Sequence, residues 1–457
     1  MSQKDILDSV RKIHFTGIGG SGMCPLAEML WALGYRVTGS DDYASDNLKR
    51  MQSLGIPVTL PLAAGNADGA ELVVYTAAIS TEHPELKAAA ARGIPLMERA
   101  KLLGLITRRY PRTVSVAGTH GKTSTTSMLA QILLTADLDP SVFIGGRLPL
   151  INANGRAGKS DLMVSEACEF LDHYLEMKTT VGIILNVDGD HLDYFGDLNG
   201  VIASFHKFAE GAEQYVIVNG EDAPAMKAVE GLPREKLIVY GYRDGCDWQA
   251  KNVGTHDGAY GEYDLYHGGV FFAHIRLGIP GAHNVQNSMA AAAAAYICGA
   301  GAEVIAKALE EYHGAGRRFE FLGTARGITV ADDYAHHPTE ITATLTAAKA
   351  LPYKRVWAVF QPFTFSRTKR LLKDFAAALS IADEALVCDI LGSREQDSGD
   401  VSSADITALM ERGRYLPTFN DVTDYLLAHA REGDLVLTMG GGNVYRCAQQ
   451  FLAKLKE

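Results

Sequence analysis

The chain of 457 residues has little cysteine, no long apolar run and fewer basic than acidic residues. Its six cysteines form no C-x-x-C pair, so the sequence predicts neither a disulfide framework nor a zinc ribbon and favours reduced thiols. No window approaches the ~18 uncharged apolar residues that a bilayer span needs, and the acidic N-terminal stretch is unlike a secretory signal. We therefore expect a soluble cytoplasmic protein with no membrane partner.

The chain has fewer basic than acidic residues: 43 Lys and Arg and 54 Asp and Glu give a formal net charge of −11. A chain of this sign repels nucleic acid and anionic lipid. We therefore expect small-molecule substrates and no nucleic-acid partner. Whether the protein is a monomer or a homodimer is left open by the sequence.

The length predicts about three domains at roughly 150 residues each, and the hydrophobic pattern divides the chain accordingly. Residues 1–109 alternate short strands and helices as a Rossmann-like unit does. Residues 110–314 predict a second parallel sheet, with an antiparallel appendage at about 251–276, and residues 315–457 predict a third, Rossmann-like unit. The fold class is thus α/β. Expected strands are 12–16, 35–38, 71–75, 113–117, 161–165, 181–185, 215–218, 328–332, 355–360, 384–389 and 434–439; expected helices are 25–33, 47–54, 123–134, 286–298, 340–349 and 368–379.

Glycine is abundant, with 46 residues, and one cluster follows the first predicted strand. Gly17-Ile-Gly19-Gly20-Ser21-Gly22 opens a helix, and Ser40 and Asp41 end the second strand. This is the dinucleotide fingerprint, in which glycines let the backbone approach a pyrophosphate and an acid meets a ribose hydroxyl. The loop fits NAD, FAD or another nucleotide diphosphate, so a nicotinamide oxidoreductase stays open at this point.

A second glycine loop, Gly118-Thr-His-Gly-Lys-Thr-Ser124, lies between a predicted strand and a helix. In this context backbone N–H groups cradle phosphates, Lys122 neutralises their charge and the hydroxyl of Thr123 faces Mg²⁺. The spacing is shorter than in the common P-loop, because Val116 stands where that pattern has its first glycine. We predict a site for a nucleotide triphosphate.

Polar residues follow the neighbouring strands and could hold magnesium. Glu166 ends one strand, and 186–191 follow the next. Mg²⁺ takes one or two protein ligands together with phosphate oxygens and water, which suits Glu166 with Thr123, and a second ion could use His191.

Three further features have open interpretations. His336 and His337 lack a third nearby ligand for zinc, so substrate contact is favoured over metal binding. The loop at 440–442 is either an anion-binding site or a tight turn. Arg317 is either a solvated side chain or a residue that binds the phosphate during its transfer.

Taken together the motifs resemble those of the Mur ligases across nearly the whole chain. They are GIGGSGM (17–23), TGSD (38–41), GTHGKTSTT (118–126), EACE (166–169), NVDGDHLD (186–193), GAHN (281–284), GRRFE (316–320), DDYAHHPTE (332–340), FQPFTFSRT (360–368) and GGGN (440–443). The resemblance implies that the N-terminal domain holds a UDP-sugar instead of a nicotinamide. It also implies an ATP-dependent ligase that joins L-alanine to the lactyl carboxylate of UDP-N-acetylmuramate through an acyl phosphate, in the cytoplasmic synthesis of peptidoglycan precursors. The alternatives are a relative that adds a tripeptide, glycine or serine, an oxidoreductase, and a nucleotide-binding partner without catalysis.

The same resemblance implies roles for individual residues. ATP contacts are implied for Gly118, Thr119, His120, Gly121, Lys122, Thr123 and Ser124, with Asn284 and Asn287 near adenine, Arg317 near the γ-phosphate and Asp332 at the ribose. Magnesium ligands are implied to be Thr123, Glu166 and His191. The UDP-sugar is implied to contact Gly19, Gly20, Ser21, Gly22, Met23, Ser40, Asp41 and Thr76, whereas His336, His337 and Arg367 face the reacting carboxylate or the amino acid.

The chain departs from the family pattern at three positions. Cys168 stands where the family commonly has Asp, and Phe363 stands where it often has His. His206, with Lys207 one step later, occupies the place of a lysine that some relatives carbamylate, so that feature is not carried over.

Overall fold

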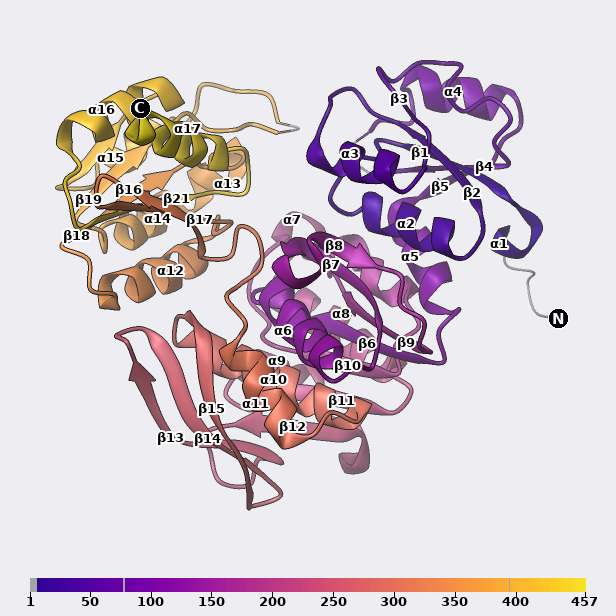
Figure 1. Cartoon of the computed structure of the whole chain (residues 1–457), viewed down its shortest axis with the longest axis horizontal. Coiled ribbons are helices and arrows are strands. Elements are labelled where there is room, and N and C mark those ends of the chain that lie inside the picture. The colour runs from indigo at the N-terminus through magenta and orange to yellow at the C-terminus, as the bar shows by residue number, and fades with distance from the viewer. Residues whose placement is uncertain (1–5, 77–78, 394) are drawn as a thin grey trace. The chain divides into compact units, whose positions relative to one another are not determined.

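The computed structural model describes residues 6–76, 79–393 and 395–457, and it consists of three β-sheets with helices packed on them (Figure 1). By their contacts these residues form two compact units. The first holds the chain up to Ala250 with Leu265–Ala273 and Gln286–Ala308, and the second holds Lys251–Asp264, His274–Val285 and Leu309–Glu457. The predicted α/β class is confirmed.

The first sheet is parallel, with the strand order β3-β2-β1-β4-β5. The chain adds β2 and β3 on one side of β1 and then β4 and β5 on its other side, so β1 lies at the switch point of the strand order. The loop after β1 therefore opens into the crevice where such sheets bind ligands. Apolar side chains of α2, α3 and α5 pack on one face of the sheet. Helix α4 packs against the side chain of Val73, which lies on the opposite face because side chains alternate along a strand. The elements are α1 (Ile6–Ser9), β1 (Lys12–Thr16), α2 (Cys24–Ala32), β2 (Arg36–Ser40), α3 (Asp46–Ser53), β3 (Val58–Thr59), β4 (Leu72–Tyr75), α4 (Pro84–Ala91), β5 (Leu96–Glu98) and α5 (Arg99–Thr107).

The second sheet has the order β15-β14-β13-β12-β11-β10-β6-β9-β7-β8. Strand β6 lies between β10 and β9 and is parallel to both, so the carboxyl ends of these three strands share one edge. The elements are β6 (Arg112–Ala117), α6 (Lys122–Thr135), β7 (Ser141–Leu148), η1 (Pro149–Ile151), β8 (Ala153–Arg156), β9 (Leu162–Glu166), η2 (Phe170–Glu176), β10 (Val181–Ile184), α7 (Leu192–Phe195), α8 (Leu198–Gly211), β11 (Tyr215–Asn219), α9 (Ala223–Ala228), η3 (Arg234–Lys236), β12 (Leu237–Gly241), β13 (Trp248–His256), β14 (Tyr260–His267), β15 (Val270–Pro280), α10 (His283–Cys298) and α11 (Ala302–Glu310).

The third sheet has the order β16-β17-β21-β18-β19-β20, parallel except for β16. Helices α12, α14 and α15 contribute to the core on one face, and α16 and α17 contribute to the core on the other. The elements are β16 (Glu320–Ala325), β17 (Ile328–Asp333), α12 (Pro338–Ala350), β18 (Arg355–Phe360), α13 (Phe365–Arg370), α14 (Leu372–Leu379), β19 (Glu384–Val387), α15 (Ser403–Thr407), β20 (Gly413–Tyr415), α16 (Phe419–His429), β21 (Asp434–Met439) and α17 (Tyr445–Lys456).

The predicted elements agree with these bounds to within a few residues, and β1, β18 and β21 coincide with their predictions. The single helix expected at 368–379 is wrong, because Leu371 leaves the helical region and separates α13 from α14. Strands β3, β5, β7, β8, β12, β16 and β20 were not predicted. They are short or interrupted by glycine, so their apolar alternation is weak.

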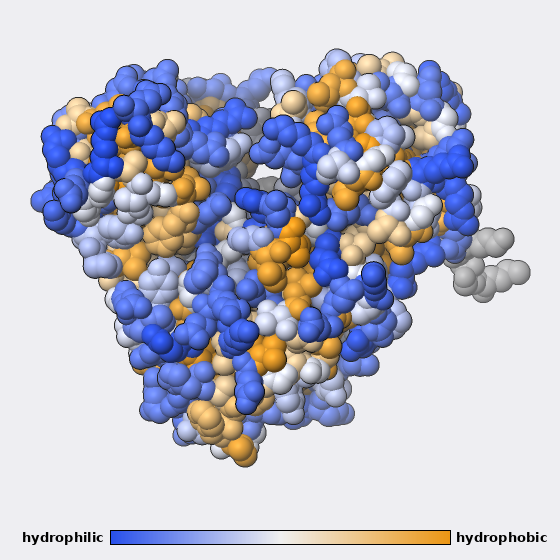
Figure 2. Space-filling view, in the orientation of Figure 1, coloured by the Kyte–Doolittle hydropathy of each residue, from blue (hydrophilic) through white to orange (hydrophobic). Residues whose placement is uncertain are grey.

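Hydrophilic side chains cover most of the face drawn in Figure 2, and apolar side chains there form separate patches. Several of the bulkiest side chains, Trp248, Trp357 and Phe205 among them, are fully buried, whereas Trp31 and Phe271 are exposed. None of the described helices is long and apolar enough to cross a membrane.

Candidate active site

The loop 118–121 joins the end of β6 to the start of α6, as the sequence predicts for a phosphate site. Gly118 and Gly121 have backbone φ angles of 150° and 84°, which residues other than glycine rarely adopt. A Cβ on Gly118 would lie 2.9 Å from the Cβ of Leu185, and one on Gly121 would lie 2.7 Å from Oδ1 of Asn287. The loop therefore needs glycine at both ends, and the N-terminus of the long helix α6 follows it directly.

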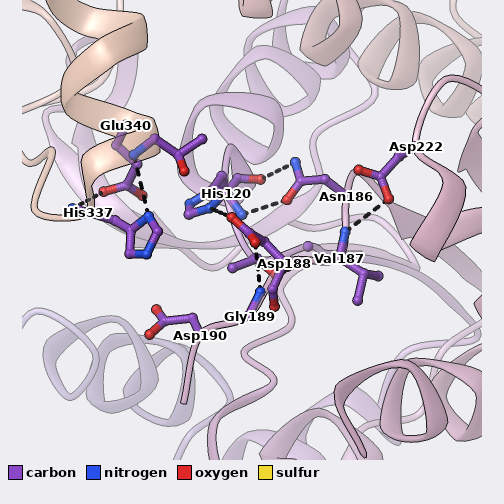
Figure 3. Close-up of polar contacts among 12 residues, drawn as sticks. His120, Asn186, Val187, Asp188, Gly189, Asp190, Asp222, His337 and Glu340 are labelled. Carbon is purple, nitrogen blue, oxygen red and sulfur yellow. Dashed lines mark hydrogen bonds and ion pairs between the residues drawn. The ribbon is translucent and has the colours of Figure 1, made fainter. Parts of the chain in front are cut away.

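The end of the neighbouring strand β10 holds this loop in place (Figure 3). The N–H of His120 donates to Oδ1 of Asn186 at 2.8 Å, and the amide nitrogen of Asn186 donates back to the His120 carbonyl at 3.1 Å. The N–H of Asp188 donates to the Thr119 hydroxyl at 2.9 Å, and a ring nitrogen of His120 lies 3.1 Å from the Asp188 carboxylate. Asn186 thus fixes the loop backbone through a neutral amide and adds no negative charge.

Lys122, the first residue of α6, is folded against the loop that it follows. Its Nζ donates to the carbonyls of Gly118 at 2.5 Å and Thr119 at 3.1 Å, and it lies 2.9 and 3.1 Å from the two carboxylate oxygens of Glu169. Burial alone would lower the pKa of Lys122, but the nearby acidic groups, Glu169 foremost, together with the hydrogen bond to Glu169 outweigh burial and raise the pKa. The ammonium is therefore a permanent positive charge at the loop.

The predicted metal ligands lie around the same strand edge. Glu166 is opposite Val116 in the β6–β9 ladder, and its Oε1 accepts from the N–H of Gly145 at 2.6 Å. Thr123 is buried in the first turn of α6. His191 precedes α7 with a left-handed φ of 53°, and its ring packs on Phe170 with centroids 4.8 Å apart. A hydroxyl, a carboxylate and an imidazole are the donors that the resemblance implies for magnesium.

The loop 17–22 after β1 has a carboxylate as its partner. The N–H of Gly19 donates to Oδ2 of Asp41 at 2.8 Å, and the N–H groups of Gly17 and Ile18 donate to the Ser40 carbonyl. Gly20 and Ser21 are exposed at the loop tip. The predicted substrate residues Gly22, Met23 and Thr76 border the same loop: Met23 precedes α2, a Cβ on Gly22 would meet Arg99, and Thr76 lies beside Gly17.

A buried polar cluster that sequence reasoning missed lies below this loop. The hydroxyls of Thr16 and Ser40 donate to Oε1 of Glu85 at 2.6 and 2.7 Å, and a ring nitrogen of His14 lies 3.1 Å from the same oxygen. The N–H of Ala63 and the amide of Asn66 donate to the other oxygen. Burial would raise the pKa of Glu85, but these hydrogen bonds outweigh it and lower the pKa to about 2. Ser40, predicted to touch substrate, uses its hydroxyl inside this cluster.

In the second unit, Arg317 is a partner of the loop at 440–442. Its Nη1 and Nη2 donate to the carbonyls of Gly442 at 2.8 Å and Gly440 at 2.7 Å, and its Nε donates to Asp332 at 2.8 Å. The guanidinium lies 4.9 Å from the Tyr334 ring and 5.0 Å from the Tyr445 ring. Each nitrogen of the guanidinium thus has a partner within this unit.

Asp332 is enclosed by the same network. Its second oxygen accepts from the Thr438 hydroxyl at 2.5 Å, and its side chain is 1% exposed. Burial raises the pKa of Asp332 despite the nearby charge of Arg317. In this arrangement the Asp332 carboxylate accepts hydrogen bonds from Arg317 and Thr438 within the protein. The expected contacts of Asp332 with ribose and of Arg317 with phosphate stay predictions.

His336 and His337 lie at the start of α12. The Nδ1 of His337 accepts from the N–H of Thr339 as the helix cap, and the carboxylate of Glu340 accepts from the N–H groups of both histidines. Figure 3 draws the His337–Glu340 contact. Arg367 lies half-buried in α13. Their expected contacts with substrate are not tested by these observations.

The two predicted adenine contacts have different surroundings. Asn287 is buried in α10 with its amide against Gly121 of the phosphate loop. Asn284 is buried in the second unit, where its amide donates to the Pro280 carbonyl at 2.8 Å.

Comparison with known proteins identifies the family. The Mur ligase family catalytic domain matches residues 12–111, the Mur ligase middle domain matches 116–295, and the Mur ligase glutamate ligase domain matches 317–442. The chain belongs to the Mur ligase family. This Mur ligase is 43% identical to the UDP-N-acetylmuramate--L-alanine ligase of Caldanaerobacter subterraneus subsp. tengcongensis, over 99% of both chains.

Solved structures of Mur ligases have the same fold. The UDP-N-acetylmuramate-alanine ligase MurC of Thermotoga maritima matches with a TM-score of 0.83 and 27% identity, over 97% of this Mur ligase and 99% of that chain. The murein peptide ligase of Psychrobacter arcticus matches with a TM-score of 0.74 and 25% identity, over 97% and 98%. The family excludes the nicotinamide oxidoreductase that the loop at 17–22 had left open.

Two functional contacts of this Mur ligase escaped the sequence reasoning. The Lys122–Glu169 pair joins α6 to the end of β9, and the two residues are 47 positions apart. The Asn186–His120 pair spans 66 positions. The only available signal was that each polar residue follows a strand parallel to β6.

Proposed function

We propose that this Mur ligase joins the amino group of L-alanine to the lactyl carboxylate of UDP-N-acetylmuramate at the expense of ATP. The reaction belongs to the cytoplasmic synthesis of peptidoglycan precursors. The observation that carries the proposal is the near full-length likeness to a ligase of that name, combined with an intact phosphate loop and its lysine.

The chemistry needs no nucleophile from the protein. The lactyl carboxylate attacks the γ-phosphorus of ATP, which breaks the bond to ADP and leaves an acyl phosphate. The amine of L-alanine then attacks the acyl carbon, an amide forms, inorganic phosphate leaves, and the amine loses a proton. The tasks of the protein are alignment and charge neutralisation, and Lys122 supplies a fixed positive charge beside the loop N–H groups.

Magnesium fits the donor set beside the loop. The hydroxyl of Thr123, the carboxylate of Glu166 and the imidazole of His191 come from elements that end or begin at one edge of the second sheet. The hydroxyl and the carboxylate are hard oxygen donors of the kind that suits this ion, the imidazole would add a nitrogen donor that the family resemblance implies, and the bound ion would neutralise phosphate charge. The N–H of Gly145 steadies Glu166 for that role.

The three domains divide the substrates. We assign the UDP-sugar to residues 1–109 with the loop at 17–22, ATP to residues 110–314 with the loop at 118–121, and the amino acid to residues 315–457 with His336, His337 and Arg367. The crevice position of the first loop and the ammonium at the second support this division.

A substrate-dependence assay of ADP release tests the proposal. We expect continuous ADP release over many turnovers only when ATP, UDP-N-acetylmuramate and L-alanine are all present. Glycine, serine and a tripeptide, each tested in place of L-alanine, should give lower kcat/KM. Faster turnover with the tripeptide would assign the chain to the recycling branch of the family, and ADP release without the sugar would contradict the proposal.

A further inference from the structure

The ammonium of Lys122 is fully engaged in the nucleotide-free protein. It has three N–H donors, and four oxygens lie within 3.1 Å of Nζ: two loop carbonyls and both oxygens of Glu169. The side chain of Lys122 is 16% exposed and that of Glu169 is 4% exposed. Lys122 can therefore donate to a nucleotide phosphate only if it releases one of these partners.

Glu169 is held firmly in its place. The turn that follows it contains Leu171 and Asp172 with left-handed φ angles of 54° and 57°, a conformation that costs free energy in residues other than glycine. The N–H of Asp172 donates to the Glu169 carbonyl at 2.9 Å, and the N–H of Tyr174 donates to the Cys168 carbonyl. A strained turn that persists in this way indicates that the position of Glu169 matters.

Glu166 and Glu169 face different partners although three positions separate them. Glu166 accepts from the backbone of β7, whereas Glu169 forms an ion pair with Lys122. The two carbonyls that accept from Lys122 belong to the backbone of the phosphate loop itself. Of the partners of Lys122, the carboxylate of Glu169 is the one that can be given up without reshaping the loop.

We propose that Glu169 is a positioning residue, which holds Lys122 in a resting position below the phosphate loop and competes with nucleotide phosphate for its ammonium. The inference rests on the proposed ATP site. The Glu169 carboxylate keeps the loop charge-balanced when the site is empty. It takes the ammonium back when ADP leaves, so it favours product release.

The test compares nucleotide binding and turnover in wild type, Glu169→Gln and Glu169→Asp. Glu169→Gln keeps the shape and removes the competing charge. We expect the Kd for ADP, measured by isothermal titration calorimetry, to fall by about three- to tenfold, and kcat to fall by a similar factor because ADP leaves more slowly. Glu169→Asp keeps the charge at a longer separation and should show a smaller change in the same direction.

Glu176→Gln is the matched control, because Glu176 is an exposed acid of the same segment and should leave both values unchanged. Melting curves establish that each variant folds, and if Glu169→Gln fails to fold, the Glu169→Asp comparison decides. Weaker or unchanged ADP binding in the folded variants overturns the inference. Absence of nucleotide binding in the wild type would instead contradict the proposed function.

Discussion

Two glycine-rich loops of the first unit both leave a parallel strand and lead into a helix, yet different charged groups contact their backbones. In the loop at 17–22 the N–H of Gly19 is bound to the carboxylate of Asp41. In the loop at 118–121 the N–H of His120 is bound to the neutral amide of Asn186, and the ammonium of Lys122 lies beneath. Carboxylates also lie at the second loop, where Glu169 pairs with Lys122 and Asp188 lies beside His120. The ammonium of Lys122 favours a highly charged triphosphate once it donates to it, which the carboxylate of Asp41 at the first loop cannot do. Similar glycine spacing thus predicts a phosphate loop, and the neighbouring charges select the ligand.

The loop at 440–442 extends the comparison to the second unit. There Arg317 binds the carbonyls of Gly440 and Gly442 and the carboxylate of Asp332, much as Lys122 binds two carbonyls of its own loop and the carboxylate of Glu169. A glycine loop and a basic residue that donates to its carbonyls are therefore insufficient evidence for a phosphate site.

Among the substitutions that test the difference between the two loops, replacement of Lys122 has the largest expected effect on activity. Lys122→Ala removes the positive charge of the second loop, and we expect kcat/KM for ATP to fall by about a thousandfold or more. The affinity for UDP-N-acetylmuramate, measured by calorimetry, should stay within twofold of wild type. Lys159→Ala, at an exposed lysine of the same unit, is the control and should have no effect on either quantity.

Replacing Glu85 tests the support below the first loop. Glu85→Gln removes a buried carboxylate that accepts five hydrogen bonds, and we expect the free energy of unfolding to fall by about 3 kcal/mol. Glu82→Gln, at an exposed neighbour, should cost far less. A loss of ATP affinity in folded Glu85→Gln would show that the two loops are not independently supported.

The low pKa of Glu85 predicts that wild type and Glu85→Gln differ in how their free energy of unfolding depends on pH. Because folding lowers this pKa from 4.5 to about 2, the carboxylate stabilises the fold fully above pH 4.5 and progressively less as the pH falls toward 2. Chemical unfolding between pH 6 and 3.5 should show a steeper loss of stability in wild type than in Glu85→Gln. Parallel slopes would contradict the ionised state of Glu85.

Replacing Asp41 has the smallest expected effect. Asp41→Asn weakens a charged hydrogen bond to Gly19, and we expect the KM for the UDP-sugar to rise by about tenfold while the KM for ATP is unchanged. Asp46→Asn, at an exposed acid of α3, serves as the control. An equal rise in the KM for ATP would indicate that the effect is general and not confined to the first loop.

The sequence predicted the central parallel strands of each sheet, several of the helices and the positions of both loops, because glycine spacing and apolar alternation are local signals. The adjacency of β9 and β10 to β6 followed from the parallel sheet, so Glu166 and Asn186 could be placed at the loop edge. The hydrogen-bond partners of Glu85, Asp332 and Arg317 within the chain could not be predicted, because tertiary packing brings them together from 15 to more than 100 positions away. The break at Leu371 also lacks any proline or glycine signal.

The most direct test of the central claim is a double dissociation in binding. Calorimetry would measure the Kd of Mg·ATP and of UDP-N-acetylmuramate for wild type, Lys122→Ala and Asp41→Asn. We predict that Lys122→Ala loses ATP affinity and keeps the sugar, and that Asp41→Asn weakens the sugar and keeps ATP. Loss of both ligands in the same variant, or the reverse pattern, would contradict the assignment of the two loops.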